Sequence, residues 1–156
     1  MSFPLSRTRH RSRAQAMVEF ALVAPLFFLL LFGIIEAGRF IFYYETLNNA
    51  TREGARYAIV NGASTIGCPS GPPAPGSTGC DVPGNNVIAH VRAAALGIGS
   101  AVTVTPEWFH NDGTLGNNGR GETVKVTATA TYNTLVPLVP LPSITISAES
   151  SLVINN

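Results

Sequence analysis

The sequence has few charged residues, and this scarcity excludes several classes of protein. Asp, Glu, Lys and Arg make up 12% of the 156 residues, whereas they make up about 25% of a typical soluble domain. The formal net charge is +1, which argues against nucleic-acid binding, because that function needs a clustered basic surface on the folded part. We therefore expect no nucleic-acid partner.

The chain also lacks the residue groupings that catalysis and metal binding require. Its nine Asp and Glu residues show no spacing that suggests an acid–base pair, and no G-x-S-x-G motif is present. His90 and His110 lie far from the two cysteines, which have no CxxC spacing. The glycines of residues 113–121 have no strand-to-helix context, so they do not form a phosphate loop. We expect no enzyme activity, no cofactor, no metal and no small-molecule substrate.

What the sequence does have is a long apolar stretch near its N-terminus. Residues 17–35 form an apolar run interrupted only by Glu19. As a helix this run covers about 28 Å, close to the roughly 30 Å of a hydrocarbon core. Pro25 lies inside the run and is tolerated more readily in a membrane helix than in a soluble one. Aromatic residues return at 40–44 and the composition stays helix-compatible, so we predict a helix from residue 15 to about residue 60.

Basic residues before the apolar run predict its orientation. Four arginines precede it: Arg7, Arg9, Arg11 and Arg13. Such residues hold their end of a membrane helix in the cytoplasm, so the C-terminal part should be extracytoplasmic. The competing interpretation is a secretory signal peptide, but the apolar regions of signal peptides span only about 7–15 residues. We expect residues 1–13 to lack regular structure and divide the chain into a basic cytoplasmic leader (1–14), a transmembrane and protruding helix (15–60) and an extracytoplasmic head (61–156).

Two cysteines, Cys68 and Cys80, follow the predicted span. If their side of the membrane is oxidising, a disulfide is permitted, and the alternative is two free thiols. We expect the disulfide, which would stabilise the fold by about 3 kcal/mol in the chain-entropy model.

Charged residues within and after the span need partners or water. Glu19 lies just inside the span, where an ionised carboxylate is costly, and no Lys or Arg follows three or four residues later. Its partner would be Arg13, another chain, or an N-terminal amine newly made by cleavage. Glu36 and Arg39 share a helix face and could pair. We expect Arg39 to reach headgroups and water instead, and leave Glu36 open.

The stretch AQAMVEF (residues 14–20) resembles the processing site of type IV pilin-like proteins. In that pattern a small residue, usually Gly, precedes the cut, and Glu is fifth in the mature chain. Cleavage between Ala14 and Gln15 makes Glu19 the fifth residue, although Ala14 stands where prepilin peptidases usually require Gly. The segments EFALVAP, GIIEAGR and REGARYA more specifically resemble the TadE-like family of minor pilins (pseudopilins) of tight-adherence (Flp) pilus systems, over about residues 13–60.

This resemblance implies a bacterial protein of the inner membrane that takes part in pilus assembly. Its expected partners are the membrane, other pilins, pilus-assembly proteins and a prepilin peptidase. The resemblance also implies that the apolar helix leaves the bilayer for a bundle of like helices, where Glu19 neutralises the N-terminal amine of a neighbouring subunit. The alternative is a single-pass anchored extracytoplasmic binding domain that does not enter a filament.

The remaining sequence predicts an α+β head. Residues 61–85 are rich in Gly and Pro and predict a surface loop, and residues 86–96 predict a short helix. Alternating patterns predict strands at 101–105 and 122–133, the first limited by Pro106, and we expect residues 143–154 to form the last of three antiparallel strands. Residues 134–142 are proline-spaced, hence extended but not a central strand.

The apolar side of the protruding helix should cover the sheet formed by these strands. Tyr43, Leu47, Ala50 and Gly54 line this side of the helix. We favour packing on the chain's own sheet over packing against another subunit. Trp108, Phe109 and His110 should anchor the core or the edge of a loop, with a surface-adhesion patch as the alternative. His90 should lie at a surface or interface.

Overall fold

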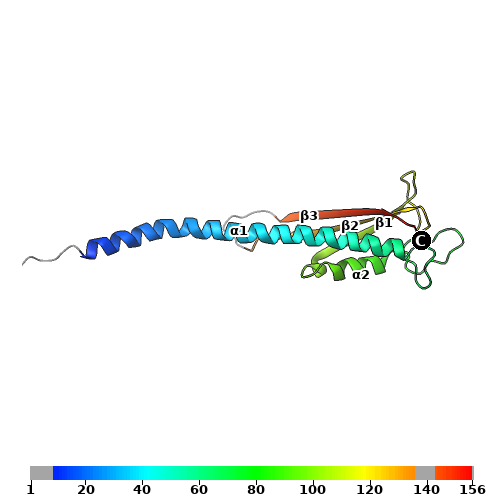
Figure 1. The fold of residues 1–156 in the computed structure, drawn as a ribbon, viewed down its shortest axis with the longest axis horizontal. Helices are drawn as coiled ribbons and strands as arrows, with labels where there is room; N and C mark the ends of the chain where they lie inside the picture. Colours follow the sequence, from blue (N-terminus) through cyan, green and yellow to red (C-terminus); the bar gives the residue numbers. More distant parts are fainter. Residues whose placement is uncertain (1–8, 136–142, 156) are drawn as a thin grey trace, which may run out of the picture. The chain divides into compact units, whose positions relative to one another are not determined.

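The computed structural model describes residues 9–135 and 143–155, with side chains from residue 14 onward. The elements, in chain order, are α1 (Arg9–Val60), α2 (Asn85–Ala94), the 3-10 turn η1 (Gly99–Ala101), β1 (Val102–Phe109), β2 (Thr123–Tyr132) and β3 (Ile144–Val153) (Figure 1). The strands form one antiparallel sheet in the order β1-β2-β3. This arrangement confirms the predicted α+β fold.

The chain forms two compact units, one up to Arg39 and one from Phe40 onward. The first is the N-terminal part of α1, and the second holds the rest of α1 with every other element. Residues 9–13 are helical, which corrects the expectation that they lack regular structure. They contain no Gly or Pro, and arginine favours helix, so the helix propagates back from the apolar run. It also continues through Pro25.

The core of the second unit lies between the helices and one face of the sheet. Gly54 of α1 faces Val91 of α2 and Val126 of β2. Burial alternates along β2, as expected for a strand with one face on a core. The prediction that α1 packs on the chain's own sheet is therefore confirmed. The fully buried apolar residues of this core include Leu47, Ala50, Ala55, Ala58, Val87, Val91, Val124, Val126, Ala128 and Ile154.

The sheet departs from the prediction at Pro106, which does not end β1. The strand continues to Phe109. Beyond Pro106, the carbonyl of Trp108 accepts a hydrogen bond from Gly116 N–H at 2.8 Å, on the side away from β2. Alternate residues of an antiparallel strand point their backbone groups the same way, so the nitrogen of Pro106 also faces away from β2. Because β1 is an edge strand, the missing N–H removes no ladder bond.

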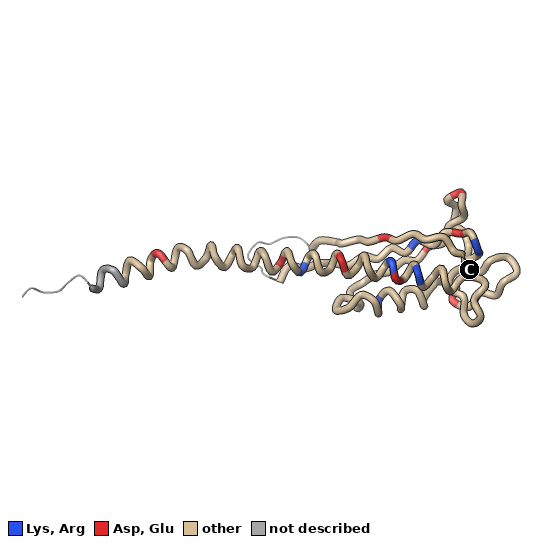
Figure 2. Tube along the Cα trace, viewed as in Figure 1, with Lys and Arg blue, Asp and Glu red and all other residues tan. Residues whose placement is uncertain are grey.

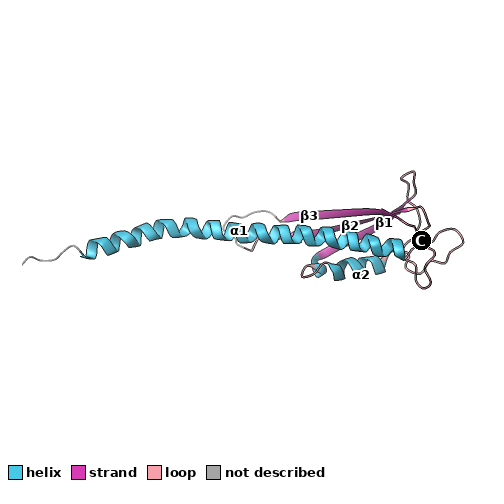
Figure 3. Cartoon of the chain, viewed as in Figure 1, coloured by secondary structure: helices cyan, strands magenta, loops and turns pink. Residues whose placement is uncertain are grey.

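The loop between α1 and α2 is closed by the disulfide Cys68–Cys80, which confirms the predicted bridge. Figure 3 shows this loop and the connector between β1 and β2 at the same end of the sheet. The loop does not lie wholly on the surface, because its residues Ser70 and Asp81 are buried.

Asp81 gives this loop a structural role at the start of α2. Its carboxylate accepts hydrogen bonds from the N–H groups of Asn85 and Asn86, both at 2.7 Å. A carboxylate in this position satisfies free amides of the first turn and complements the helix dipole. The helix then ends at Ala94, two residues before the predicted end.

Trp108 is only 4% exposed, which confirms its place in the core. Gly71 and Gly84 lie so close to the indole that a Cβ at either position would overlap it, and both have positive φ angles. The disulfide loop therefore covers Trp108. Among the described residues the indole Nε1 has no hydrogen-bond partner. The predicted extended segment at 134–142 falls mostly outside the described residues.

Candidate functional site

The N-terminal unit of α1 exposes an apolar surface. Met17, Phe20 and Leu22 are 76%, 72% and 74% exposed, and none of the most apolar 18-residue window is buried within the protein. An apolar helix without protein cover is stable in an apolar environment such as a bilayer or a bundle of like helices. In length and composition α1 is sufficient to cross a membrane.

Charge is sparse between residues 14 and 35 of this unit, as Figure 2 shows. After Glu19 the next charged residue is Glu36. Gln15 lies one helical turn before Glu19 on the same face. Among the described side chains, from residue 14 onward, Glu19 has no hydrogen bond or ion pair. A carboxylate in an apolar segment needs a cationic partner, and a neighbouring subunit could provide one.

The predicted processing and orientation residues lie at the start of the same helix. Ala14 and Gln15 are exposed and helical. Arg9, Arg11 and Arg13 are also in α1, while Arg7 lies outside the described residues. Cleavage, membrane orientation and the pairing of Glu19 stay predictions.

The structure corrects the expectation for Arg39. Its Nη1 lies 3.2 Å from both carboxylate oxygens of Glu36. The side chains are only 29% and 19% exposed. Residues three apart share a helix face, so the pair forms within the helix and Arg39 does not reach only headgroups and water. Mutual neutralisation lowers the cost of placing both groups near an apolar phase.

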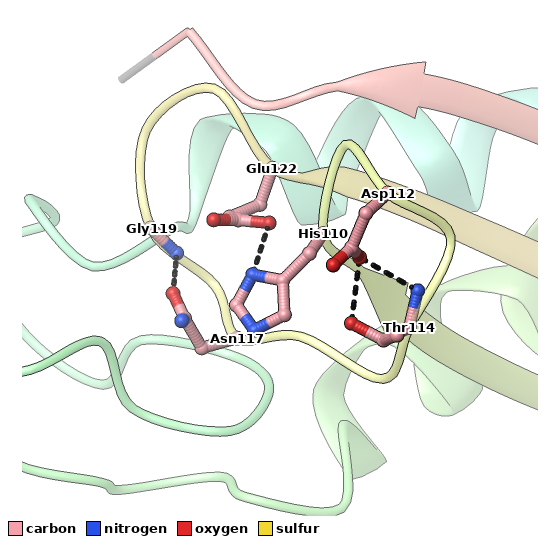
Figure 4. A network of polar contacts seen from close by, with 6 residues as sticks. All are labelled: His110, Asp112, Thr114, Asn117, Gly119 and Glu122. Carbon is pink, nitrogen blue, oxygen red and sulfur yellow. Dashed lines mark hydrogen bonds and ion pairs between the residues drawn. The ribbon is translucent and has the colours of Figure 1, made fainter.

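A polar cluster stabilises the segment between β1 and β2, residues 110–122, which we call the connector (Figure 4). His110 Nδ1 lies 2.9 Å from Glu122 Oε2, across the connector. Asp112 accepts hydrogen bonds from the hydroxyl of Thr114 at 2.6 Å and from its N–H at 2.9 Å. These bonds, the hydroxyl first, hold the pKa of Asp112 below its ordinary value of 3.8. The Asp112-Gly-Thr114 spacing is typical of a side-chain-stabilised turn, and it could have indicated this contact.

Neither this cluster nor the rest of the described chain gathers three metal-ligating side chains. His90 stacks on Tyr57 with ring centroids 4.6 Å apart, and its Nε2 lies 3.7 Å from Glu53 Oε1. Its side chain is 40% exposed, which agrees with the predicted surface position. These contacts connect α2 to α1.

Buried polar residues, which were not predicted from the sequence, join the segment between β1 and β2 (residues 110–122) to the disulfide-closed loop between α1 and α2. Asn118 is 1% exposed; its amide N–H donates to the Ser70 carbonyl, and its Oδ1 accepts from Ala74 N–H, both at 3.2 Å. Ser70 in turn donates its hydroxyl to Asp81 at 3.3 Å. These contacts join segments up to 48 residues apart, a separation that no local pattern reports.

Comparison with known proteins identifies the helix rather than the head. Residues 14–56 match the model of the TadE-like protein family. No curated protein and no solved structure matches the chain. The matched stretch contains the exposed apolar segment, Glu19, the Glu36–Arg39 pair and Gly54. The chain thus carries a TadE-like family domain at residues 14–56.

Proposed function

We propose that this protein is a membrane-anchored minor pilin or pseudopilin that takes part in assembly of a tight-adherence (Flp-type) pilus. The observation that carries the proposal is a coincidence in position. The TadE-like match covers the exposed apolar helix and most of its packing face on the head. A helix that only anchored a domain would need apolar composition, without a family-specific pattern that extends into the core.

The proposed mechanism transfers the apolar segment from the bilayer into a bundle of like helices. The transfer requires that the segment be covered by neither its own sheet nor its own loops, and the described side chains of the segment meet that requirement. Inside the bundle, the carboxylate of Glu19 in one subunit forms an ion pair with the N-terminal amine of a neighbouring subunit. Such a pair in a low-dielectric environment costs much more to break than a surface ion pair.

Processing would supply that amine. A prepilin peptidase that cuts between Ala14 and Gln15 places the new amine one helical turn before Glu19. Within one chain the amine and Glu19 lie on the same helix face. Between two chains that are offset along the bundle, the amine of one chain can lie beside Glu19 of the other. The arginines at positions 7, 9, 11 and 13 keep the leader in the cytoplasm, where it is removed.

The part from residue 61 onward would then lie outside the cytoplasm. A closed Cys68–Cys80 bridge suits that oxidising compartment. The polar clusters of the head tie loops together, and the described residues contain no group of three metal-ligating side chains. We propose a structural role for the protein; that it has no enzyme activity, no cofactor and no nucleic-acid partner stays a prediction.

The second candidate is a permanently anchored extracytoplasmic binding domain. The compact unit from Phe40 onward, which has its own core, favours it, because such a unit could act alone on a simple tether.

A helix exchange separates the two candidates. Residues 14–39 are replaced by an unrelated transmembrane helix of equal length, and the variant is expressed in the native bacterium lacking the original copy. We expect normal membrane anchoring and loss of surface pili, because the replacement anchors but cannot enter the bundle. Wild-type piliation by the exchanged protein would support the tether instead. A charge-preserving control, Glu36→Asp in the original helix, should pilate normally.

A further inference from the structure

The two edges of the sheet differ in whether another strand can pair with them. The edge of β1 is blocked at both ends: Arg92 Nε donates to the Val102 carbonyl at 3.2 Å, and Gly116 N–H donates to the Trp108 carbonyl at 2.8 Å. Between these contacts Pro106 has no N–H to offer. These features protect an edge strand from further pairing.

The outer edge of β3 has no such protection in the described residues. Ile154, just after β3, donates its N–H to the Glu122 carbonyl at 2.8 Å. This hydrogen bond shows which residues of β3 direct their backbone groups toward the neighbouring strand β2. By alternation, five residues of β3 point their backbone groups away from β2. They are Thr145, Ser147, Glu149, Ser151 and Val153, and the side chains of all five are exposed.

The composition of β3 also suits pairing. The strand is ten residues long, contains no Pro or Lys, and carries a single charge, at Glu149. Natural edge strands usually carry lysine, proline or a bulge to prevent association. A long edge without them is a template for strand addition, in which backbone hydrogen bonds supply affinity.

A second copy of the chain is a poor occupant of this edge. Tyr132, opposite the start of β3, contacts Phe40 and Tyr43 of α1, and Gly62 lies beside Ile154 after its end. The strand and residues 40–62 therefore run in the same direction, as Figure 1 also shows. If two β3 strands paired antiparallel, residues 40–62 of the two copies would run in opposite directions. Two copies anchored in one bilayer cannot both satisfy that arrangement, a step that rests on the proposed function.

Parallel pairing of two copies meets a different obstacle. In a parallel ladder the outward-facing residues of one strand lie opposite inward-facing residues of the other. Two identical edges then need an odd register shift, which a twofold axis along the strands does not allow. Pairing of β3 with β1 of a second copy is prevented by the blocked β1 edge.

We propose that the outer edge of β3 binds an extended, proline-free strand of a different extracytoplasmic protein, with a basic side chain opposite Glu149. Lys125 of β2 lies 3.2 Å from one carboxylate oxygen of Glu149, yet the glutamate side chain remains 52% exposed. A cation on the incoming strand would occupy its other side, and opposite charges across a strand pair stabilise the pairing.

The test uses the full chain in detergent micelles and a fluorescent peptide of alternating threonine and valine with one central lysine. The control peptide has the same side chains with N-methyl groups on alternate backbone nitrogens, which prevents strand pairing. We expect saturable binding of the first peptide only, together with slowed amide exchange at the five outward residues. Ser147→Pro, which removes one outward N–H, should weaken binding at least about tenfold, or about 1.4 kcal/mol. Ser147→Ala keeps the N–H and should bind like the parent.

Charge reversal provides a variant that keeps every backbone donor. Glu149→Lys should weaken binding of the lysine peptide and favour a peptide with central glutamate. Three results would overturn the proposal: no binding, equal binding of the N-methylated peptide, or a dimer of the parent chain that Ser147→Pro abolishes, which would make a second copy the occupant. No pilus is needed for this test, so its failure is distinct from a failure of the helix exchange.

Discussion

Gly54 of α1 lies directly against Val91 of α2, so close that a Cβ at position 54 would overlap the valine side chain. Val126 of β2 closes the other side of the same site. The helix, α2 and the sheet therefore meet at one residue without a side chain. This contact explains why a glycine, which lowers helix stability, occupies a buried turn of α1.

Gly54→Ala should destabilise the head. The added methyl gains up to about 1 kcal/mol in helix propensity but forces Val91 to move, and overpacking costs about 1–3 kcal/mol. We expect a lower melting temperature of the full chain in micelles. Gly38→Ala is the matched control, because a Cβ there meets no atom within 4 Å. A variant at position 54 that is as stable as the control would contradict the packing.

Opening the disulfide should destabilise the loop more than the sheet. Replacing Cys68 and Cys80 by serine removes a cross-link between residues 12 apart, which stabilises by about 3 kcal/mol in the chain-entropy model. The β-sheet signal in circular dichroism should persist, while amide exchange of Asn85 and Asn86 should accelerate because Asp81 is less well placed. Thiol labelling of the unreduced, denatured parent should find no free cysteine; labelling of both would refute the bridge.

The turn at Asp112 should depend on acidity. Because the folded-state pKa of Asp112 lies below 3.8, its stabilising effect is complete above pH 3.8 and is lost as the pH falls through the folded value. A carboxyl titration by NMR should place its midpoint below 3.8. Thr114→Val, which removes the hydroxyl donor but keeps the N–H, should raise that midpoint. A midpoint unaffected by the substitution would show that the hydroxyl is not the main cause.

Glu19→Ala should leave membrane insertion intact or improve it, because the substitution removes a costly charge from the apolar segment. Recovery with the other pilus components should fall at least about tenfold, since breaking a buried ion pair costs about 3–5 kcal/mol. Glu36→Ala is the control and should have a smaller effect, because its partner Arg39 lies in the same helix. Co-purification of Glu19→Ala at the parent level would mean that Glu19 is a tolerated charge with no pairing role.

The sequence predicted the features of the fold that local patterns encode. The apolar run located the helix, and the sequence located β2, by its alternation, and β3 within one residue at each end. Pro106 misled because its effect depends on which way its nitrogen faces, and only the register with β2 decides that. Arg39 was assigned to headgroups because a sequence gives no rotamer.

Contacts between residues far apart in the sequence could not be predicted from local sequence patterns. Nothing local to Trp108 indicates that Gly71 and Gly84 cover its ring. The difference between the blocked edge of β1 and the open edge of β3 likewise arises from strand order and from Arg92, which is on α2. The family pattern in residues 14–56 could be recognised because it is contiguous.

The mature N-terminus tests the proposed pilin role most directly. Mass spectrometry of the full chain purified from membranes of its native host would determine where the protein begins. We predict a start at Gln15, which makes Glu19 the fifth residue and supplies the amine with which it pairs. A chain that retains its leader would support a permanent tether, and a chain that begins after residue 36 would indicate secretion; either result would contradict the pilin.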